Sequence, residues 1–467
     1  MQNLVLKIQK QEKMKDILTL LAIFVLTFSC GHDQKEVPEE PSGQEEKETV
    51  GQPLSPWQEG QMDIHFINTT TGESVFMIFP DGTQMLVDAA GSLVKTGEAK
   101  NTGIRQRWDP MTEPDFSAGK YIAEYITKCM EWTGNRKLDY VLATHFHGDH
   151  FGAYSKTLPL SDLSSTYRKQ SLPEVLDLVP SVKLMDRGWP DYAYPFDMQT
   201  KASNSGAVSN YVKAVKWHID NRGLVAERFK AGSRDQIVLK RKPSDYPGFI
   251  VQNIAVNGEI WDGGSTTTAT ATFPPLAEIR VADTKDVGND DNCPEENHCT
   301  CVLKVSYGAF DFFEGGDAQY DGMSTFPWKD METPVGLVTG PVDVMKADHH
   351  GVNNTNGYGY ISKVTGMKAE AMKYLQPTCW IVNSWTDGHP RVVTFDGVTA
   401  LYPAMDIYVT NICDDTRTYG NFSQIKGFNG HIVVRVYKGG AVYKVYTVSD
   451  SDRKMTVKKI SKEYRSK

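Results

Sequence analysis

The part of this 467-residue chain richest in reactive side chains is the six-residue segment HFHGDH. It contains three histidines and one aspartate, namely His145, His147, Asp149 and His150. Imidazole and carboxylate groups are ligands for zinc, manganese and iron in proteins. On a tight loop, residues two apart can face one metal ion while the next two face another. The segment therefore predicts a metal site.

The sequence around this segment predicts that it lies at the rim of a β-sheet. The segment directly follows LDYVLAT, residues 138–144, whose composition is typical of a buried strand. Polar residues that follow a hydrophobic strand collect at the edge of a sheet, where active sites form. A helix is expected before this strand, over Ser117–Trp132, because apolar residues recur there at i, i+3, i+4 and i+7.

Strands and helices alternate along much of the chain, which predicts an α/β fold. Short β-rich runs at residues 62–68, 74–79 and 84–90 open the folded part, and the turn sequence FPDGT joins the second to the third. Hairpins are expected at 300–317 and 431–448. The apolar content of 40% is enough to fill a substantial core, so wholesale disorder is excluded.

The segment HFHGDH resembles the first metal motif of the metallo-β-lactamase superfamily, and later segments resemble its other motifs in order. FFEGGD, which ends at Asp317, resembles the strand that ends in Gly-Asp. VMKADHHG and NSWTDGHP resemble the last metal motif and the late Gly-His-Pro motif of the branch that includes the ComEC competence-protein hydrolase domain. Residues 62–90 look like the first strands of that branch. The resemblance covers roughly residues 62–400.

The resemblance implies an α/β fold of the metallo-β-lactamase type, an αββα sandwich built as one large domain. The hydrolase domain is expected over residues 62–420, with a long insertion at about 153–296 between the first and second metal motifs. Since the insertion has no clear pattern, we expect helices and loops there that cap the site. Residues 421–467 are expected to form a C-terminal β extension and a basic tail.

The resemblance also implies two metal ions with a defined set of ligands. The expected ligands are His145, His147 and His298 for the first ion, Asp149, His150 and one of His349 and His350 for the second, and Asp317 as the carboxylate that bridges both. The third ligand of the first ion stays open. His298 precedes Asp317 by one hairpin, but the branch often has Asn near this position, where Asn297 stands, and His218 competes.

The resemblance assigns catalytic roles to Asp149, Asp317, His350 and His389. Asp149 would orient the nucleophile as well as bind metal. Whichever of His349 and His350 does not meet the metal would contact the substrate or support the ligands. His389 either contacts a leaving group or phosphate oxygen, or is a structural loop residue.

These features lead to the hypothesis of a two-metal hydrolase. Two divalent ions, zinc first with manganese or iron as alternatives, would lower the pKa of a shared water so that hydroxide attacks the substrate. A small or surface-linked phosphodiester is favoured, because the HHG and GHP motifs resemble the branch linked with phosphodiesters. Nucleic acid is not favoured, since the net charge is −8. The alternatives are a hydrolase of a lactone, thioester or lactam, and a non-catalytic surface binding module that retains the metal-site fold.

The N-terminus has the pattern of a targeting signal. Lys13 and Lys15 precede the apolar run 17–29, which ends at Cys30 and is too short to span a bilayer comfortably. The ending LTFSC resembles a bacterial lipobox. It implies a signal peptide over residues 1–29, a lipid on Cys30, and anchoring to the cell envelope, either periplasmic or at the outer surface. The alternative is an ordinary signal peptide followed by an unrelated cysteine.

Residues 30–61 are acidic and rich in Gln, Pro and Gly, so they are expected to form a flexible tether. The protein is expected to be a monomer. Six cysteines follow Cys30, and Cys293, Cys299 and Cys301 are close enough in sequence to leave pairing or a zinc knuckle open.

Overall fold

The computed structural model describes residues 48–91, 117–279, 292–322, 324, 326–352, 365–384, 389–412 and 422–467. The expected signal peptide, Cys30 and most of the expected tether lie outside these residues. The described residues all belong to one unit that covers residues 48–467.

Two mixed β-sheets form the centre of the fold. The first has the strand order β20-β19-β18-β1-β2-β3-β4-β5-β6, with β21 paired to β19. The second has the order β17-β16-β15-β13-β11-β10-β7-β8-β9.

The bounds of the first-sheet strands are β1 Met62–Phe66, β2 Val75–Ile78, β3 Gln84–Val87, β4 Leu138–Ala143, β5 Ser181–Asp186, β6 Val225–Arg228, β18 His431–Tyr437, β19 Val442–Val448, β20 Val457–Ile460 and β21 Tyr464–Arg465. Those of the second sheet are β7 Phe249–Val256, β8 Glu259–Trp261, β9 Ala269–Ala271, β10 Val302–Tyr307, β11 Phe310–Glu314, β13 Val344–Lys346, β15 Cys379–Val382, β16 Asp406–Val409 and β17 Ile425–Phe428. A separate pair joins β12 Tyr320–Asp321 to β14 Thr365–Gly366.

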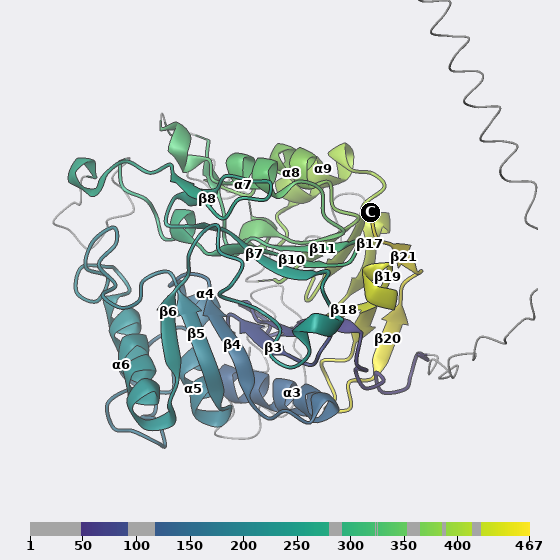
Figure 1. The fold of residues 1–467 in the computed structure, drawn as a ribbon, viewed down its shortest axis with the longest axis horizontal. Coiled ribbons are helices and arrows are strands. Elements are labelled where there is room, and N and C mark those ends of the chain that lie inside the picture. Colours follow the sequence, from purple (N-terminus) through teal and green to yellow (C-terminus); the bar gives the residue numbers. More distant parts are fainter. Residues whose placement is uncertain are drawn as a thin grey trace, which may run out of the picture. The chain divides into compact units, whose positions relative to one another are not determined.

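Helices cover the outer face of each sheet, which gives the expected αββα sandwich (Figure 1). The helices are α3 Ala118–Thr133, α4 Gly148–Phe151, α5 Ser171–Leu178, α6 Ser205–Arg222, α7 Glu332–Thr339, α8 Met372–Leu375 and α9 Val392–Leu401. Helices α3, α5 and α6 pack on the first sheet, and α7, α8 and α9 pack on the second.

The alternation of side chains along each strand divides the core into layers. In β2, Val75 and Met77 face the second sheet, whereas Phe76 and Ile78 face the helices. All four are buried, because this strand is covered on both faces. The helix expected over Ser117–Trp132 is confirmed as α3, with the Ser117 side chain accepting the Lys120 N–H at its N-cap.

The expectation of capping helices and loops over residues 153–296 is wrong in part. This stretch contains α5 and α6, but also β5 and β6 of the first sheet and β7, β8 and β9 of the second. The short strands lie among many Gly, Pro and Ser residues, which hide their alternation in the sequence. Most of the expected insertion is therefore part of the sandwich.

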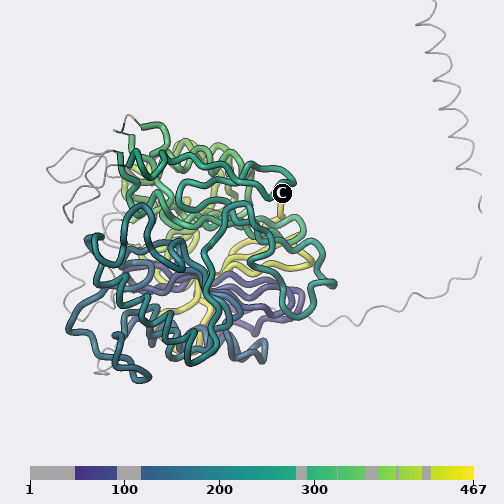
Figure 2. The backbone as a smooth tube through the Cα atoms, turned by 60° about the vertical axis from the view of Figure 1, so that its left-hand side comes forward, coloured from purple at the N-terminus to yellow at the C-terminus, as the bar shows by residue number. Residues whose placement is uncertain are grey.

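Both ends of the described part of the chain also join the sandwich. Strand β18 pairs with β1, so the C-terminal strands lie beside the N-terminal ones (Figure 2). Residues 48–61, expected as tether, are packed instead, since Leu54 and Trp57 are buried in the core under α3. The acidic and Pro-rich composition of the tether concealed these two apolar anchors.

The described cysteines, Cys129, Cys293, Cys299, Cys301 and Cys379, are all buried. None of them belongs to a metal-binding group among the described residues, so the zinc knuckle considered above does not form there. Within the described part of the chain, no helix is long and apolar enough to cross a membrane.

A buried ion pair fastens the C-terminal strands to β1. Arg435 in β18 donates from Nε to Asp63 Oδ1 at 2.8 Å and from Nη2 to Asp63 Oδ2 at 2.7 Å. Burial alone would raise the pKa of Asp63, but the Arg435 charge lowers it below its usual value. The pair's contribution to stability is therefore complete above about pH 4 and is lost as the pH falls further.

We expect R435M to lower the free energy of unfolding by about 3–5 kcal/mol at pH 7, because it leaves the Asp63 carboxylate buried without a partner. The control is K444M, at the position of β19 that pairs with Arg435. Lys444 is about one-third exposed, and its nearest carboxylate oxygen, on Glu463, lies 3.9 Å away, so its loss should cost about 0–1 kcal/mol. Urea unfolding followed by circular dichroism measures both, and equal losses would contradict the prediction.

Candidate metal centre

The residues of the candidate metal centre follow the carboxyl ends of two strands in each sheet. Asp88 and His145 follow the parallel strands β3 and β4 of the first sheet. Asp317 and His350 follow the parallel strands β11 and β13 of the second. The carboxyl ends of parallel neighbours meet at one edge, so residues distant in sequence converge there.

Two groups of side chains at this edge are arranged so that each could hold a metal ion, and Asp317 belongs to both. The first group contains His145, His147 and Asp317, and the second contains Glu73, His150, Asp317 and His350. Within each group the possible ligand atoms lie within 4.8 Å of one another.

In the first group, the two histidines of the HFH sequence point toward each other. His145 Nε2 lies 3.1 Å from His147 Nδ1 and 3.7 Å from Asp317 Oδ2. The other ring nitrogen of His145 lies 3.1 Å from the Thr144 hydroxyl. Burial lowers the pKa of His145 well below its usual value, so this imidazole is neutral and can donate a lone pair to a metal.

In the second group, two imidazoles and two carboxylates converge. His150 Nε2 lies 3.1 Å from Asp317 Oδ2, and His350 Nε2 lies 3.7 Å from the same oxygen. His350 Nε2 is also 3.2 Å from Asp149 Oδ2, so Asp149 borders this group.

The second nitrogen of each of these imidazoles is held from behind. His150 Nδ1 lies 2.8 Å from Asp88 Oδ2, and His350 Nδ1 lies 3.0 Å from the carbonyl oxygen of Asn383. Such partners fix the ring orientation and leave Nε2 to face Asp317. Asp88 also accepts the backbone N–H and the hydroxyl of Thr144. Sequence reasoning missed Asp88, although its place at the end of the strand QMLV was a signal.

Glu73 was missed as well, and it plays a supporting role here. Lys346 Nζ donates to Glu73 Oε2 at 2.8 Å and to the Gly316 carbonyl at 2.7 Å. Burial would lower the pKa of Lys346, but the carboxylates of Glu73 and Glu314 raise it above its usual value. Glu73 is thus neutralised by a buried ammonium, and it faces Nδ1 of His350 rather than Nε2.

The donor chemistry of the two groups fits divalent metal ions. Both carboxylate oxygens of Asp317 are buried and accept no hydrogen bond. Burial would raise the pKa of Asp317, but the surrounding histidine charges lower it well below its usual value, so the group is ionised. A buried carboxylate that lacks hydrogen-bond donors and lies between imidazoles is suited to bridging two cations.

The two neighbouring histidines of DHHG adopt an uncommon backbone conformation. His349 has φ 46° and His350 has φ 54°, both in the left-handed region. Such residues cost on the order of 1–3 kcal/mol each and cluster at functional sites. The turn separates the two rings: His350 Nε2 faces Asp149 and Asp317, while His349 Nε2 lies 3.2 Å from Asn297 Nδ2 and 3.9 Å from Asp317 Oδ2.

The expected insertion holds the HFH turn through Phe146. Glu296 Oε1 accepts the Phe146 N–H at 2.7 Å, and the Asn204 amide donates to the Phe146 carbonyl. Arg187 donates to both oxygens of Glu296, and its guanidinium lies 4.9 Å from the centre of the Phe146 ring. His145 and His147 therefore flank a residue, Phe146, whose backbone and side chain are both held in place.

His298 and His218, both considered as the third ligand of the first ion, do not join either group. His298 Nδ1 accepts the Glu295 N–H at 3.3 Å, and its Nε2 lies 3.2 Å from the Lys329 carbonyl. This corrects the expectation for His298, which turns away because its short helical turn directs the ring toward Lys329. His218 Nε2 in α6 lies 3.0 Å from Asp177 Oδ1 in the neighbouring helix α5.

His389 lies beside the second group without belonging to it. Its ring is buried, and the centre of the ring is 6.1 Å from that of His350. Residues 385–388, which belong to the same sequence motif, lie outside the described residues.

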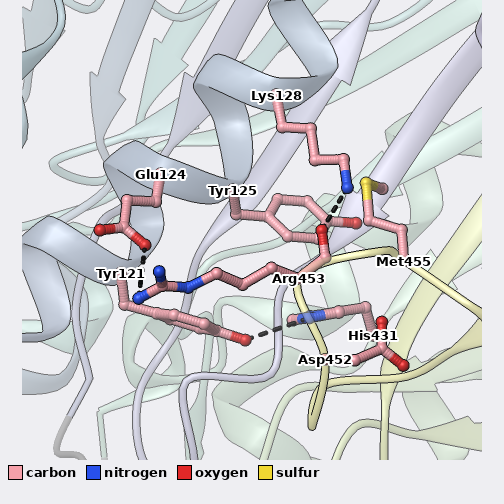
Figure 3. Close-up of a pocket in the computed structure, with 8 residues that line it drawn as sticks. All are labelled: Tyr121, Glu124, Tyr125, Lys128, His431, Asp452, Arg453 and Met455. Carbon is pink, nitrogen blue, oxygen red and sulfur yellow. Dashed lines mark hydrogen bonds and ion pairs between the residues drawn. The ribbon is translucent and has the colours of Figure 1, made fainter. Parts of the chain in front are cut away.

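A separate pocket of about 140 Å³ lies between α3, the start of β18 and the loop 452–455 (Figure 3). Its polar groups interact with one another: the Tyr121 hydroxyl lies 3.1 Å from His431 Nε2, and Arg453 pairs with Glu124 at 3.4 Å. No residue of either metal group lines it. These contacts join the helix to the C-terminal strands.

Comparison with known proteins does not identify a family. No family model matches the chain, and no curated protein matches it. Among solved structures, the isothiocyanate hydrolase from Delia radicum gut bacteria matches with a TM-score of 0.32 and 10% sequence identity. The match covers 75% of this chain and 97% of that chain. A likeness at this TM-score says nothing about the function of this chain.

We expect D317N to lose most of its zinc, with apparent affinity reduced at least about tenfold, because Asp317 belongs to both groups. H298Q should retain the zinc content of the wild type, since both ring nitrogens of His298 contact other groups. Elemental analysis after dialysis against a fixed low zinc concentration measures both variants. A loss of zinc in H298Q as large as that in D317N would return His298 to the ligand set.

Proposed function

We propose that this protein is a metal-dependent hydrolase that cleaves a phosphodiester. The observation that carries the proposal is the buried Asp317 carboxylate, which lies between two groups of histidines and accepts no hydrogen bond. Two divalent ions bound there would activate water at neutral pH and stabilise the negative charge that develops on a phosphoryl oxygen. Zinc is the first candidate, with manganese and iron as alternatives.

The buried and the partly exposed residues of the site would have different roles. His145, His150, His350 and Asp317 are buried and exclude water from the inner side of the site. His147, Asp149 and His349 are partly exposed, so a substrate would reach the site from their side. Burial would raise the pKa of Asp149, but the charges of His150 and His350 lower it well below its usual value. Asp149 is thus a carboxylate that can orient a water molecule.

The phosphodiester class is supported by the motifs DHHG and Gly-His-Pro, which place His349 and His389 near the second group. Imidazoles at these positions can donate hydrogen bonds to phosphate oxygens or to a leaving group. We further propose a small or surface-linked substrate, a lipid anchor on Cys30 in the bacterial cell envelope, and a monomeric state. The lipobox-like sequence before Cys30 supports the anchor.

We expect the purified protein to hydrolyse bis-p-nitrophenyl phosphate, and we expect H147A and D317A each to lose at least about 100-fold in kcat/KM. The expected loss corresponds to several kcal/mol of charge stabilisation that the metals supply. H218Q is the matched control, because His218 contacts Asp177 and joins neither metal group. Full activity after removal of metal by a chelator would contradict the proposal.

The same assay separates the alternatives. Turnover confined to a lactone, thioester or lactam would retain the hydrolase and exclude the phosphodiester. Bound metal with no turnover of any of these substrates would favour the binding module.

A further inference from the structure

We propose that the two metal positions are unequal, with the position at His145 and His147 binding its ion more weakly than the position at His150 and His350. This inference rests on the proposed metal-dependent function. It predicts that the protein carries one ion at low metal concentration and gains the second only as the concentration rises.

The first observation is the difference in donor number. The second position has two imidazoles, His150 and His350, together with the carboxylates of Asp149 and Asp317. The first position has His145 and His147 with only the shared carboxylate of Asp317. The third imidazole that His298 was expected to supply turns toward Lys329 instead. The first position therefore has one imidazole or carboxylate ligand fewer than the second.

Asn297 contacts His349, whose Nε2 lies 3.9 Å from the Asp317 carboxylate that both positions share. Asn297 Nδ2 donates to Gln319 Oε1 at 3.0 Å and lies 3.2 Å from His349 Nε2. These contacts fix which end of the amide is the oxygen. Asn297 Oδ1 is buried and has no hydrogen-bond partner. A neutral amide oxygen suits hard ions such as calcium or magnesium and is a poorer ligand for zinc than an imidazole.

The second observation is the difference in what holds the imidazoles from behind. In the second position, Asp88 contacts His150 Nδ1 at 2.8 Å and so raises the ring's basicity with a full negative charge. In the first position, His145 Nδ1 faces the neutral hydroxyls of Thr144 at 3.1 Å and Thr300 at 3.5 Å. Loss of such an outer partner changes metal affinity by about 10–100-fold in other proteins. This difference acts in the same direction as the donor number.

The experiment is a titration of the metal-free, full-length protein with zinc alone, in competition with a chromophoric chelator. We expect the wild type to bind two zinc ions in two phases, with dissociation constants at least about tenfold apart. N297D keeps the shape of the side chain and adds a charged ligand, and N297H adds an imidazole. Each should strengthen the weak phase and leave the tight phase unchanged.

Two further variants make the test specific. D88N should weaken the tight phase more than the weak phase, because it removes the charge in direct contact with His150 Nδ1. H298Q is the matched control for the position next to Asn297 and should bind zinc in the same two phases as the wild type. Thermal unfolding of each metal-free variant confirms that it folds, and N297D replaces N297H in the comparison if the larger side chain prevents folding.

The outcomes separate this inference from the proposed function. Two zinc ions bound with equal affinity, or a weak phase that N297D and N297H leave unchanged, would overturn the inequality and leave the hydrolase in place. Binding of a single zinc ion at all concentrations would also overturn it. Failure to bind any zinc would overturn the metal-dependent function itself, together with this inference.

Discussion

The arrangement of the site depends on one buried negative charge, the carboxylate of Asp317. A carboxylate removed from water without hydrogen bonds is unstable unless positive charge lies close to it. A ring nitrogen of each of His145, His150 and His350 lies 3.1–3.7 Å from its Oδ2, and the Lys346 ammonium donates to the backbone carbonyl of the preceding residue. The buried Asp317 carboxylate therefore favours positive charge at this edge of the two sheets.

The sandwich supplies that edge through parallel strands. Strands β3 and β4 end beside each other in one sheet, and β11 and β13 do so in the other. The two sheets pack through a shared apolar layer, so the loops after these four strands lie on the same side. Rigid strands thereby position side chains that come from loops, and the strain at His349 and His350 is tolerated because β13 and its neighbours are buried.

The sequence allowed the fold class, the helix α3 and the first metal motif to be predicted, because each leaves a local pattern. The cluster around His145 to His150 is contiguous, and β2 to β4 are compact runs of mostly apolar residues. Asp88, Glu73 and Lys346 were not recognised, since a single charged residue after a strand has no distinguishing spacing. His298 was assigned wrongly because spacing along a hairpin does not determine which way a ring turns. The strands within residues 153–296 are short and separated by Gly, Pro and Ser, so no period emerges.

The contacts at Phe146 link distant parts of the chain to the positions of His145 and His147. The residue between the two histidines of the first group is held by Glu296, Asn204 and Arg187, which lie far from it in the sequence. A substitution that removes one of these contacts would free the turn that carries His145 and His147. Substitutions between residues 187 and 296 are therefore constrained even where the side chain lies outside both groups, and those that preserve the Phe146 contacts would leave the two histidines in place.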